Sequence, residues 1–258
     1  MKLNDFFCKN TTIGLSVNFL NALNTRIPGM PDGGPVYAET NLHSLIAEPW
    51  NAISSLAFLV PVIYWAIRLK GKYKEYPFLT ICLPLLFAGG IGSTLFHAFR
   101  YSRYLLWMDV LPIAILTLLV SIYFWYKVLP KTWMVAVIVI VSVAIRFLLF
   151  SRRFLTLEGH ITVNIAYFIT GFMIFLPSLI ILIKSRFLGV WQLTLACLFF
   201  IISLTFRQID NLEPPLLPMG THWLWHVTGA VGSWLLGNYL YIINDLSFKK
   251  QYNKEVYS

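Results

Sequence analysis

The sequence predicts an all-α membrane protein, a bundle of seven transmembrane helices. Two observations predict this class. The chain of 258 residues is 58% hydrophobic and only 12% charged, and it carries 20 Phe, 13 Tyr and 9 Trp, a balance far from that of a soluble domain. It also contains repeated apolar stretches of about 20 residues, the length that one helix needs to cross a bilayer.

Seven apolar stretches follow residue 48, at 50–69, 78–98, 105–126, 133–150, 161–183, 188–206 and 222–243. Runs such as "VAVIVIVSVAI" lack the alternation of apolar and polar residues that a transmembrane β-barrel requires, so helices are expected throughout. The sequence thus predicts three parts: an N-terminal extramembrane segment at 1–47, the seven-helix transmembrane domain at 48–245, and a basic cytosolic tail at 246–258.

The basic residues predict how the bundle is oriented. The formal charge of +9 is dispersed among loops at helix ends, which is typical of membrane topology and argues against nucleic-acid binding. More of these charges lie on the side of the C-terminus, including Arg68, Lys70, Lys72, Lys74, Lys127, Lys131, Lys184, Arg186, Lys249, Lys250 and Lys254. The positive-inside rule therefore predicts a cytosolic C-terminus and an exterior or lumenal N-terminus.

Five polar residues of the predicted membrane helices are candidates for a functional site. Ser93 and His97 are four apart in "GSTLFH", and Asp109 lies near the start of the next helix. His222 and His226 are four apart at the head of "HWLWHVTGAVGSWL", so each pair shares one helix face. Alternating helix directions place all five residues near the non-cytosolic face, which predicts one polar site at that level.

Three neutral imidazoles form a sufficient ligand set for a catalytic zinc ion, which keeps a further position for water. His97, His222 and His226 can supply that set. Residue 223 is Trp, so the glutamate of an H-E-x-x-H motif is missing. Asp109, the only carboxylate in the apolar spans, is then the candidate base, and Ser93 is the candidate hydrogen-bond donor beside the metal.

Two other interpretations of these residues remain open. They can form a structural polar cluster that holds helices together, or a relay for proton or ion transport. A transport pathway would continue polar residues toward the cytosolic side, and the inner halves of these helices offer almost none.

Several motifs, taken together, resemble the alkaline ceramidase family. They are "IAEPWNAISSLAF" at 46–58, "GSTLFH" at 92–97, "LLWMDVLP" at 105–112, "IDN" at 209–211 and "HWLWHVTGAVGSWL" at 222–235. That family belongs to a superfamily of seven-helix membrane hydrolases that also includes the progestin and adipoQ receptors.

The resemblance implies an integral membrane zinc hydrolase that acts on a linear amide bond. It would cleave the N-acyl bond of ceramide, or of a related N-acyl lipid in the membrane, to a sphingoid base and a free fatty acid. His97, His222 and His226 match the family's zinc ligands, and Ser93 and Asp109 match its polar pair beside the metal. The receptor branch implies an alternative, a membrane receptor or sensor whose zinc is structural or weakly hydrolytic.

The resemblance also implies a calcium site in the N-terminal segment. Glu39 and Asn41 in "AETN" match its E-x-N element, and Glu48 in "AEPWN" matches its last acidic ligand. The aspartate expected before Glu39 is replaced by Val36. Helix capping by Glu48 and Asn51 is the alternative interpretation.

Overall fold

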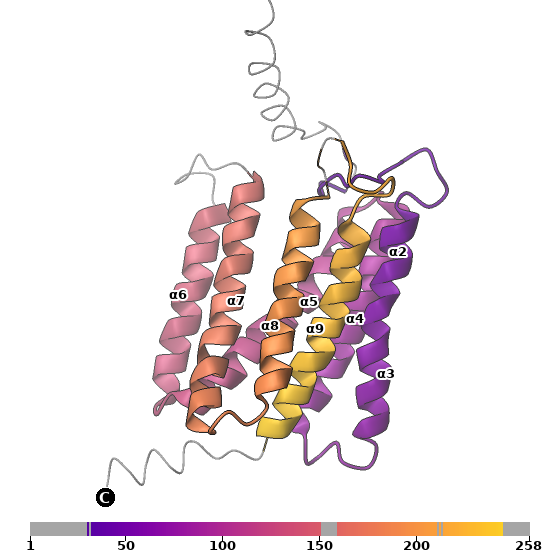
Figure 1. The fold of residues 1–258 in the computed structure, drawn as a ribbon. Coiled ribbons are helices and arrows are strands. Elements are labelled where there is room, and N and C mark those ends of the chain that lie inside the picture. The colour runs from indigo at the N-terminus through magenta and orange to yellow at the C-terminus, as the bar shows by residue number, and fades with distance from the viewer. Residues whose placement is uncertain (1–29, 31, 151–158, 211, 213, 245–258) are drawn as a thin grey trace, which may run out of the picture.

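The computed structural model describes residues 30, 32–150, 159–210, 212 and 214–244. Long helices lie side by side across this part of the chain (Figure 1), and it contains no β-strand. The all-α prediction is therefore confirmed for these residues. The predicted tail at 246–258 and most of the predicted segment at 1–47 lie outside them. The helices are α2 (Pro49–Ser55), η1 (Leu56–Phe58), α3 (Leu59–Arg68), α4 (Pro77–Phe99), α5 (Arg103–Val128), α6 (Thr132–Phe150), α7 (Gly159–Lys184), α8 (Val190–Gln208) and α9 (His222–Ile243).

The first predicted span is one rod made of three pieces, α2, η1 and α3. Pro49 occupies the first turn of α2, where its missing N–H costs no hydrogen bond. Pro61 lies in the first turn of α3 and cannot donate to the preceding turn, which explains why the chain tightens into the 3-10 helix η1 just before it. Together the pieces cover Pro49–Arg68.

Helix α9 lies inside the bundle. It packs against α2, α3, α4 and α8, while α4 also packs along α5. Many of its residues are buried, including Gly229, Gly232 and Gly237. A Cβ atom on each of these three glycines would meet aromatic side chains of neighbouring helices, namely Phe58, Phe200 and Trp65. They therefore serve close helix packing.

The main apolar core lies toward the ends of α3 and α9. Trp65, Leu69, Phe124, Ile181 and Tyr239 are each at most 2% exposed and belong to one cluster. The Tyr239 hydroxyl donates a 3.1 Å hydrogen bond to the Ser178 carbonyl. This end of the bundle is thus held by aromatic and aliphatic packing.

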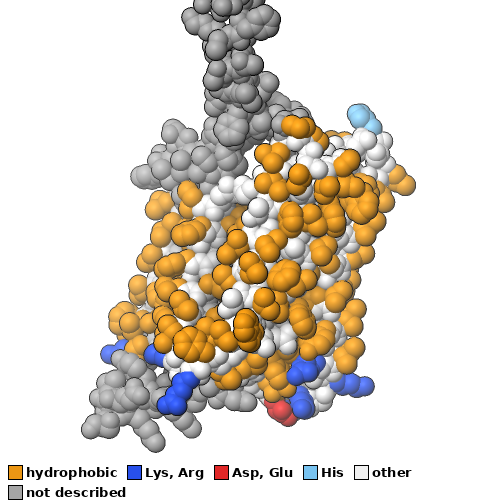
Figure 2. Space-filling model, viewed as in Figure 1, with side chains coloured by type: hydrophobic (Ala, Val, Ile, Leu, Met, Phe, Trp, Pro, Cys, Tyr) orange, Lys and Arg blue, Asp and Glu red, His pale blue; other side chains and the backbone are white. Residues whose placement is uncertain are grey.

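The outer surface is apolar over the middle of the bundle. Figure 2 shows hydrophobic side chains over the helices and Lys and Arg side chains along the edge nearest the end of α9. Phe168 and Trp191 are 73% and 72% exposed, an arrangement that suits contact with lipid.

Five helices are long and apolar enough to cross a membrane, judged by length and composition. They are α2 to α3 taken together, α4, α5, α7 and α8. The apolar part of α6, Thr132–Leu148, is shorter, and α9 is not among the five. A helix surrounded by other helices needs less apolar surface, which explains the composition of α9. The seven-span count stays a prediction.

Candidate metal centre

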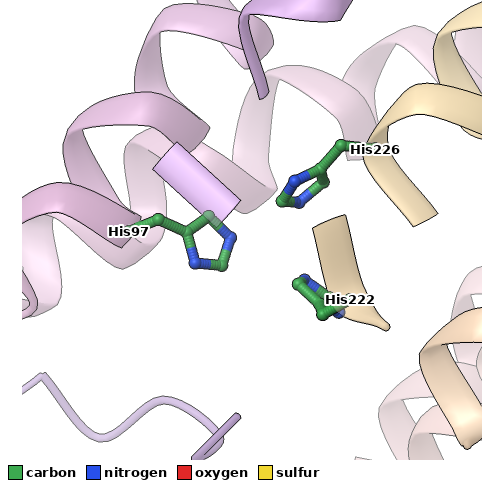
Figure 3. Close-up of side chains that lie close together, drawn as sticks. All are labelled: His97, His222 and His226. Carbon is green, nitrogen blue, oxygen red and sulfur yellow. The ribbon is translucent and has the colours of Figure 1, made fainter. Parts of the chain in front are cut away.

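Three buried histidines meet where α4 ends and α9 begins. His97 comes from the last turn of α4, and His222 and His226 come from the first two turns of α9. Their ring centroids lie 4.8 to 5.3 Å apart, and one nitrogen of each lies within 4.8 Å of the others. Figure 3 shows the three rings turned toward one another. The structure therefore brings together the three residues that the sequence predicts as metal ligands.

His97 is oriented by Glu48, the residue before α2. The Glu48 carboxylate is fully buried and forms a short contact with His97 Nδ1. Burial raises the pKa of Glu48 above its ordinary value, and the Arg100 guanidinium beside it opposes that shift. A carboxylate on one imidazole nitrogen fixes the ring and leaves Nε2 as its metal-binding atom.

His226 is oriented by two serines of α2. Its Nδ1 atom lies 2.9 Å from Ser54 Oγ and 3.2 Å from Ser55 Oγ. Both hydroxyls also donate to the Asn51 carbonyl, at 3.1 and 2.8 Å. The first helix therefore holds this ring in place, and Nε2 is again the nitrogen left for a metal.

His222 is positioned through its backbone. Asp210 Oδ1 accepts hydrogen bonds from the backbone N–H groups of Thr221 and His222, at 2.7 and 2.8 Å. An acidic side chain at this place satisfies free N–H groups at the start of α9 and suits the helix dipole. Asp210 Oδ2 accepts a further 3.0 Å bond from the Ala38 N–H, so one carboxylate joins the start of α9 to the N-terminal segment.

Tyr37 covers the histidine cluster from the N-terminal segment. Its ring centroid lies 3.9 Å from that of His222 and 5.2 Å from that of His97. Burial raises the pKa of the Tyr37 hydroxyl well above its ordinary value, although Arg207 opposes the shift. The hydroxyl consequently remains protonated and is able to donate a hydrogen bond.

Ser93 and Asp109 lie beside the cluster. Ser55 Oγ lies 3.0 Å from Ser93 Oγ, within hydrogen-bonding distance, and the Asp109 carboxyl lies beside the Ser93 hydroxyl. Gly92 makes this possible, because a Cβ atom there would collide with the backbone of Met108 and Asp109. Helices α4 and α5 therefore approach closely beside Ser93 and Asp109.

The donor set fits zinc. Three imidazoles with neighbouring nitrogen atoms can hold one ion of this kind. Two of them already have a partner on Nδ1, and the Nδ1 atom of His222 is buried without a hydrogen-bond partner among the described residues. A buried unpartnered nitrogen is costly, and coordination of a metal by His222 is one way to offset that cost. Among the residues that the structure describes, no other group of three or more His, Cys, Asp or Glu side chains is placed to hold a metal.

The residues predicted for calcium each contact a group of the protein. Glu39 accepts hydrogen bonds from the backbone N–H groups of Trp50 and Asn51, at 3.0 and 2.6 Å. Asn41 Oδ1 accepts from the His43 N–H at 3.1 Å. Glu48 occupies the N-cap position of α2, but its side chain makes no capping bond there, and the Glu39 carboxylate supplies that bond instead.

Sequence reasoning missed several residues around the cluster. Ser54 and Ser55 lie inside the motif "IAEPWNAISSLAF" and Asp210 lies inside "IDN", so their place in those motifs was the available signal. Arg100 follows His97 by one helical turn. Tyr37 lies in a loop and had no pattern of its own, because loop conformation depends on contacts that are distant in sequence.

Comparison with known proteins finds a distant similarity to a ceramidase. No protein-family model matches the sequence. The chain is 26% identical over 208 residues to alkaline ceramidase 3 of Mus musculus, a match that covers 74% of this chain and 75% of the mouse protein. This distant similarity supports a relation to the alkaline ceramidases.

Proposed function

We propose that the protein is an intramembrane zinc-dependent amide hydrolase that cleaves the N-acyl bond of ceramide or a related N-acyl lipid. The products would be a sphingoid base and a free fatty acid. The observation that carries this proposal is the buried cluster of His97, His222 and His226 with a carboxylate and a hydroxyl beside it. The similarity to a ceramidase supports the class of substrate.

His97, His222 and His226 would hold the zinc ion. Zinc bound by three imidazoles lowers the pKa of a water molecule to about 7 and polarises a carbonyl group. The donor set is pre-arranged for this, because Glu48 and the two α2 serines fix two of the rings.

Asp109 and Ser93 would carry the proton transfer and the stabilisation of charge. Asp109 accepts a proton from the attacking water while the oxygen of that water bonds to the amide carbon. Ser93 donates a hydrogen bond to the carbonyl oxygen while negative charge develops there. Asp109 then returns the proton to the nitrogen as the C–N bond breaks, so that the amine leaves neutral and the fatty acid keeps the water oxygen.

The substrate would enter from the bilayer. The described helices present apolar side chains outward, so a two-tailed lipid can reach the site laterally without leaving hydrocarbon. We infer the seven-span topology with the site toward the exterior or lumenal face. The basic residues Arg68, Lys127 and Lys184, in the last turns of α3, α5 and α7, support it through the positive-inside rule, because they lie at the opposite ends of the helices. In this account residues 48–245 form the catalytic domain, between the segment at 1–47 and the tail at 246–258.

A turnover assay tests the proposal. Purified protein in detergent is incubated with ceramide, and the released sphingoid base is quantified for wild type, His226→Ala and His43→Ala. His43 is exposed and lies outside the cluster, so His43→Ala is the matched control. We expect release by wild type and His43→Ala and background release by His226→Ala. Zinc-loaded wild type that releases no base from ceramides or other N-acyl lipids would favour the receptor alternative.

A further inference from the structure

We propose that the Arg100 guanidinium is the cation that joins the N-terminal segment to the histidine cluster, and that it stands where calcium is expected. The protein would then bind no calcium at Glu39, Asn41 and Glu48. Arg100 is a positioning residue that acts on His97 through Glu48, so this part of the proposal rests on the proposed function.

Arg100 is enclosed by acceptors. Its side chain is fully buried, and its Nε atom donates a 2.5 Å bond to Asp32 Oδ2. Nη2 donates to the Pro35 carbonyl at 2.7 Å and to Asp32 Oδ1 at 3.3 Å, and Nη1 donates to Glu48 Oε1. Each nitrogen of the guanidinium therefore has a partner, and the group bridges two buried carboxylates.

Glu48 is the link between Arg100 and the cluster. Its Oε1 accepts from Arg100 and, at 2.6 Å, from the Thr40 hydroxyl. Its Oε2 contacts His97 Nδ1 and lies 3.4 Å from the Asn51 amide nitrogen. Both carboxylate oxygens are thus used, and the chain Asp32, Arg100, Glu48, His97 runs without interruption from the N-terminal segment to the cluster.

The predicted calcium ligands do not fit that ion. Calcium takes six to eight oxygen ligands. Both carboxylate oxygens of Glu39, however, accept hydrogen bonds from backbone N–H groups at the start of α2, and the side-chain oxygen of Asn41 accepts one from the N–H group two residues further on. The remaining carboxylate, Glu48, is paired with a fixed positive charge that would repel a second cation. The structure differs from the expected calcium site at one identifiable place, because the Arg100 guanidinium contacts Glu48, the carboxylate that a calcium ion would need as a ligand.

The backbone conformation of Arg100 also indicates that its side chain has a specific role in this site. Arg100 ends α4 in the left-handed conformation, with φ of 54°, where glycine is the usual residue. Next to it, the N–H groups of Ala47 and Glu48 donate to the carbonyls of Ala98 and His97, at 2.8 and 3.1 Å. The contacts of its side chain explain why an arginine is found at a position that favours glycine.

The first arm of the test measures calcium on the wild-type protein. Purified, calcium-depleted protein is equilibrated with calcium across a dialysis membrane, and its melting temperature is recorded with and without added calcium. We expect no bound calcium above a buffer control and no shift in melting temperature. Stoichiometric binding, or a rise in melting temperature on calcium addition, overturns the proposal, and this arm needs no variant.

The second arm measures zinc affinity by competition with a chromophoric chelator in Arg100→Gln, Glu48→Gln, the double variant and Arg100→Lys. Loss of a group that orients a metal ligand typically weakens metal binding about 10- to 100-fold. We expect that loss in each single variant, and a double variant no weaker than the worse single variant because both act through one link. Arg100→Lys, which keeps the charge, should recover part of the affinity.

Arg103→Gln is the matched control, since Arg103 is exposed and lies three residues further on. Wild-type zinc affinity in folded Arg100→Gln, or fully additive losses in the double variant, would overturn the positioning role. A wild-type protein that binds no zinc would instead refute the proposed function. In that case the absence of bound calcium in the first arm would still support the assignment of Arg100 as the cation.

Discussion

The two ends of the helix bundle are held together by different forces. Toward the end of α9, Trp65, Phe124 and Tyr239 pack in an apolar core. Toward its start, buried charged and polar side chains such as Glu48, Arg100 and Asp210 are joined by hydrogen bonds between the loops and three helices.

The difference predicts how each end responds to substitution. Apolar packing contributes many small contacts, so a change there lowers the stability of the whole bundle. A buried polar group depends on its partner, and removing one member leaves the other uncompensated. We therefore expect the core end to control folding stability and the polar end to control metal binding and catalysis.

The largest effect on catalysis without loss of metal is expected for Asp109→Asn. An asparagine has nearly the same shape but cannot accept the proton, so the rate should fall about 100- to 10,000-fold while zinc content stays that of wild type. Rates and metal content are measured on the same preparation. Wild-type turnover in this variant would remove Asp109 from the role of base.

Phe124→Ala tests the core end. Removing a fully buried aromatic ring should lower the free energy of unfolding by about 3–5 kcal/mol, measured by thermal or chemical denaturation in detergent. The folded fraction should keep its zinc. Loss of zinc without loss of stability would mean that the two ends are not separable.

Gly92→Ala tests the close approach of α4 and α5, with Gly171→Ala as its matched control. The new methyl group would collide with the Met108 backbone, and overpacking of this kind costs about 1–3 kcal/mol. It should also displace Asp109 and slow turnover. A methyl group at Gly171 meets nothing within 4 Å, so stability should stay equal or rise by up to about 1 kcal/mol. Equal behaviour of the two variants would argue against the close approach.

The smallest effect is expected for Ser93→Ala. This variant loses one hydrogen-bond donor near the reacting carbonyl, so turnover should fall about tenfold with zinc retained. Zinc is again measured beside the rate. Release of the metal would show that Ser93 supports the ligands rather than the reaction.

The helices and the histidine cluster could be predicted from the sequence for a simple reason. Helix direction alone puts the end of α4 and the start of α9 at one level, and spacing puts His222 and His226 on one face. The cluster is confirmed by the structure, while the roles of Asp109 and Ser93 stay predictions.

The partners of the histidines could not be predicted in the same way. The family resemblance implies that Glu48 binds calcium, and the position of Glu48 just before a helix predicts a helix cap. Its actual neighbour, Arg100, is 52 residues away and is brought there by the left-handed end of α4. Contacts of this kind depend on how residues 32–48 lie against the helix ends around the histidine cluster, which no periodicity encodes.

The most direct test of the central claim is the metal content of the purified protein. Wild type and His43→Ala should contain about one zinc ion per chain, and His97→Ala, His222→Ala and His226→Ala should each contain almost none, because three imidazoles form the whole protein ligand set. The same three variants should release no sphingoid base from ceramide. Zinc retained at the wild-type level in any of them, or ceramide hydrolysis by zinc-free protein, would contradict the account.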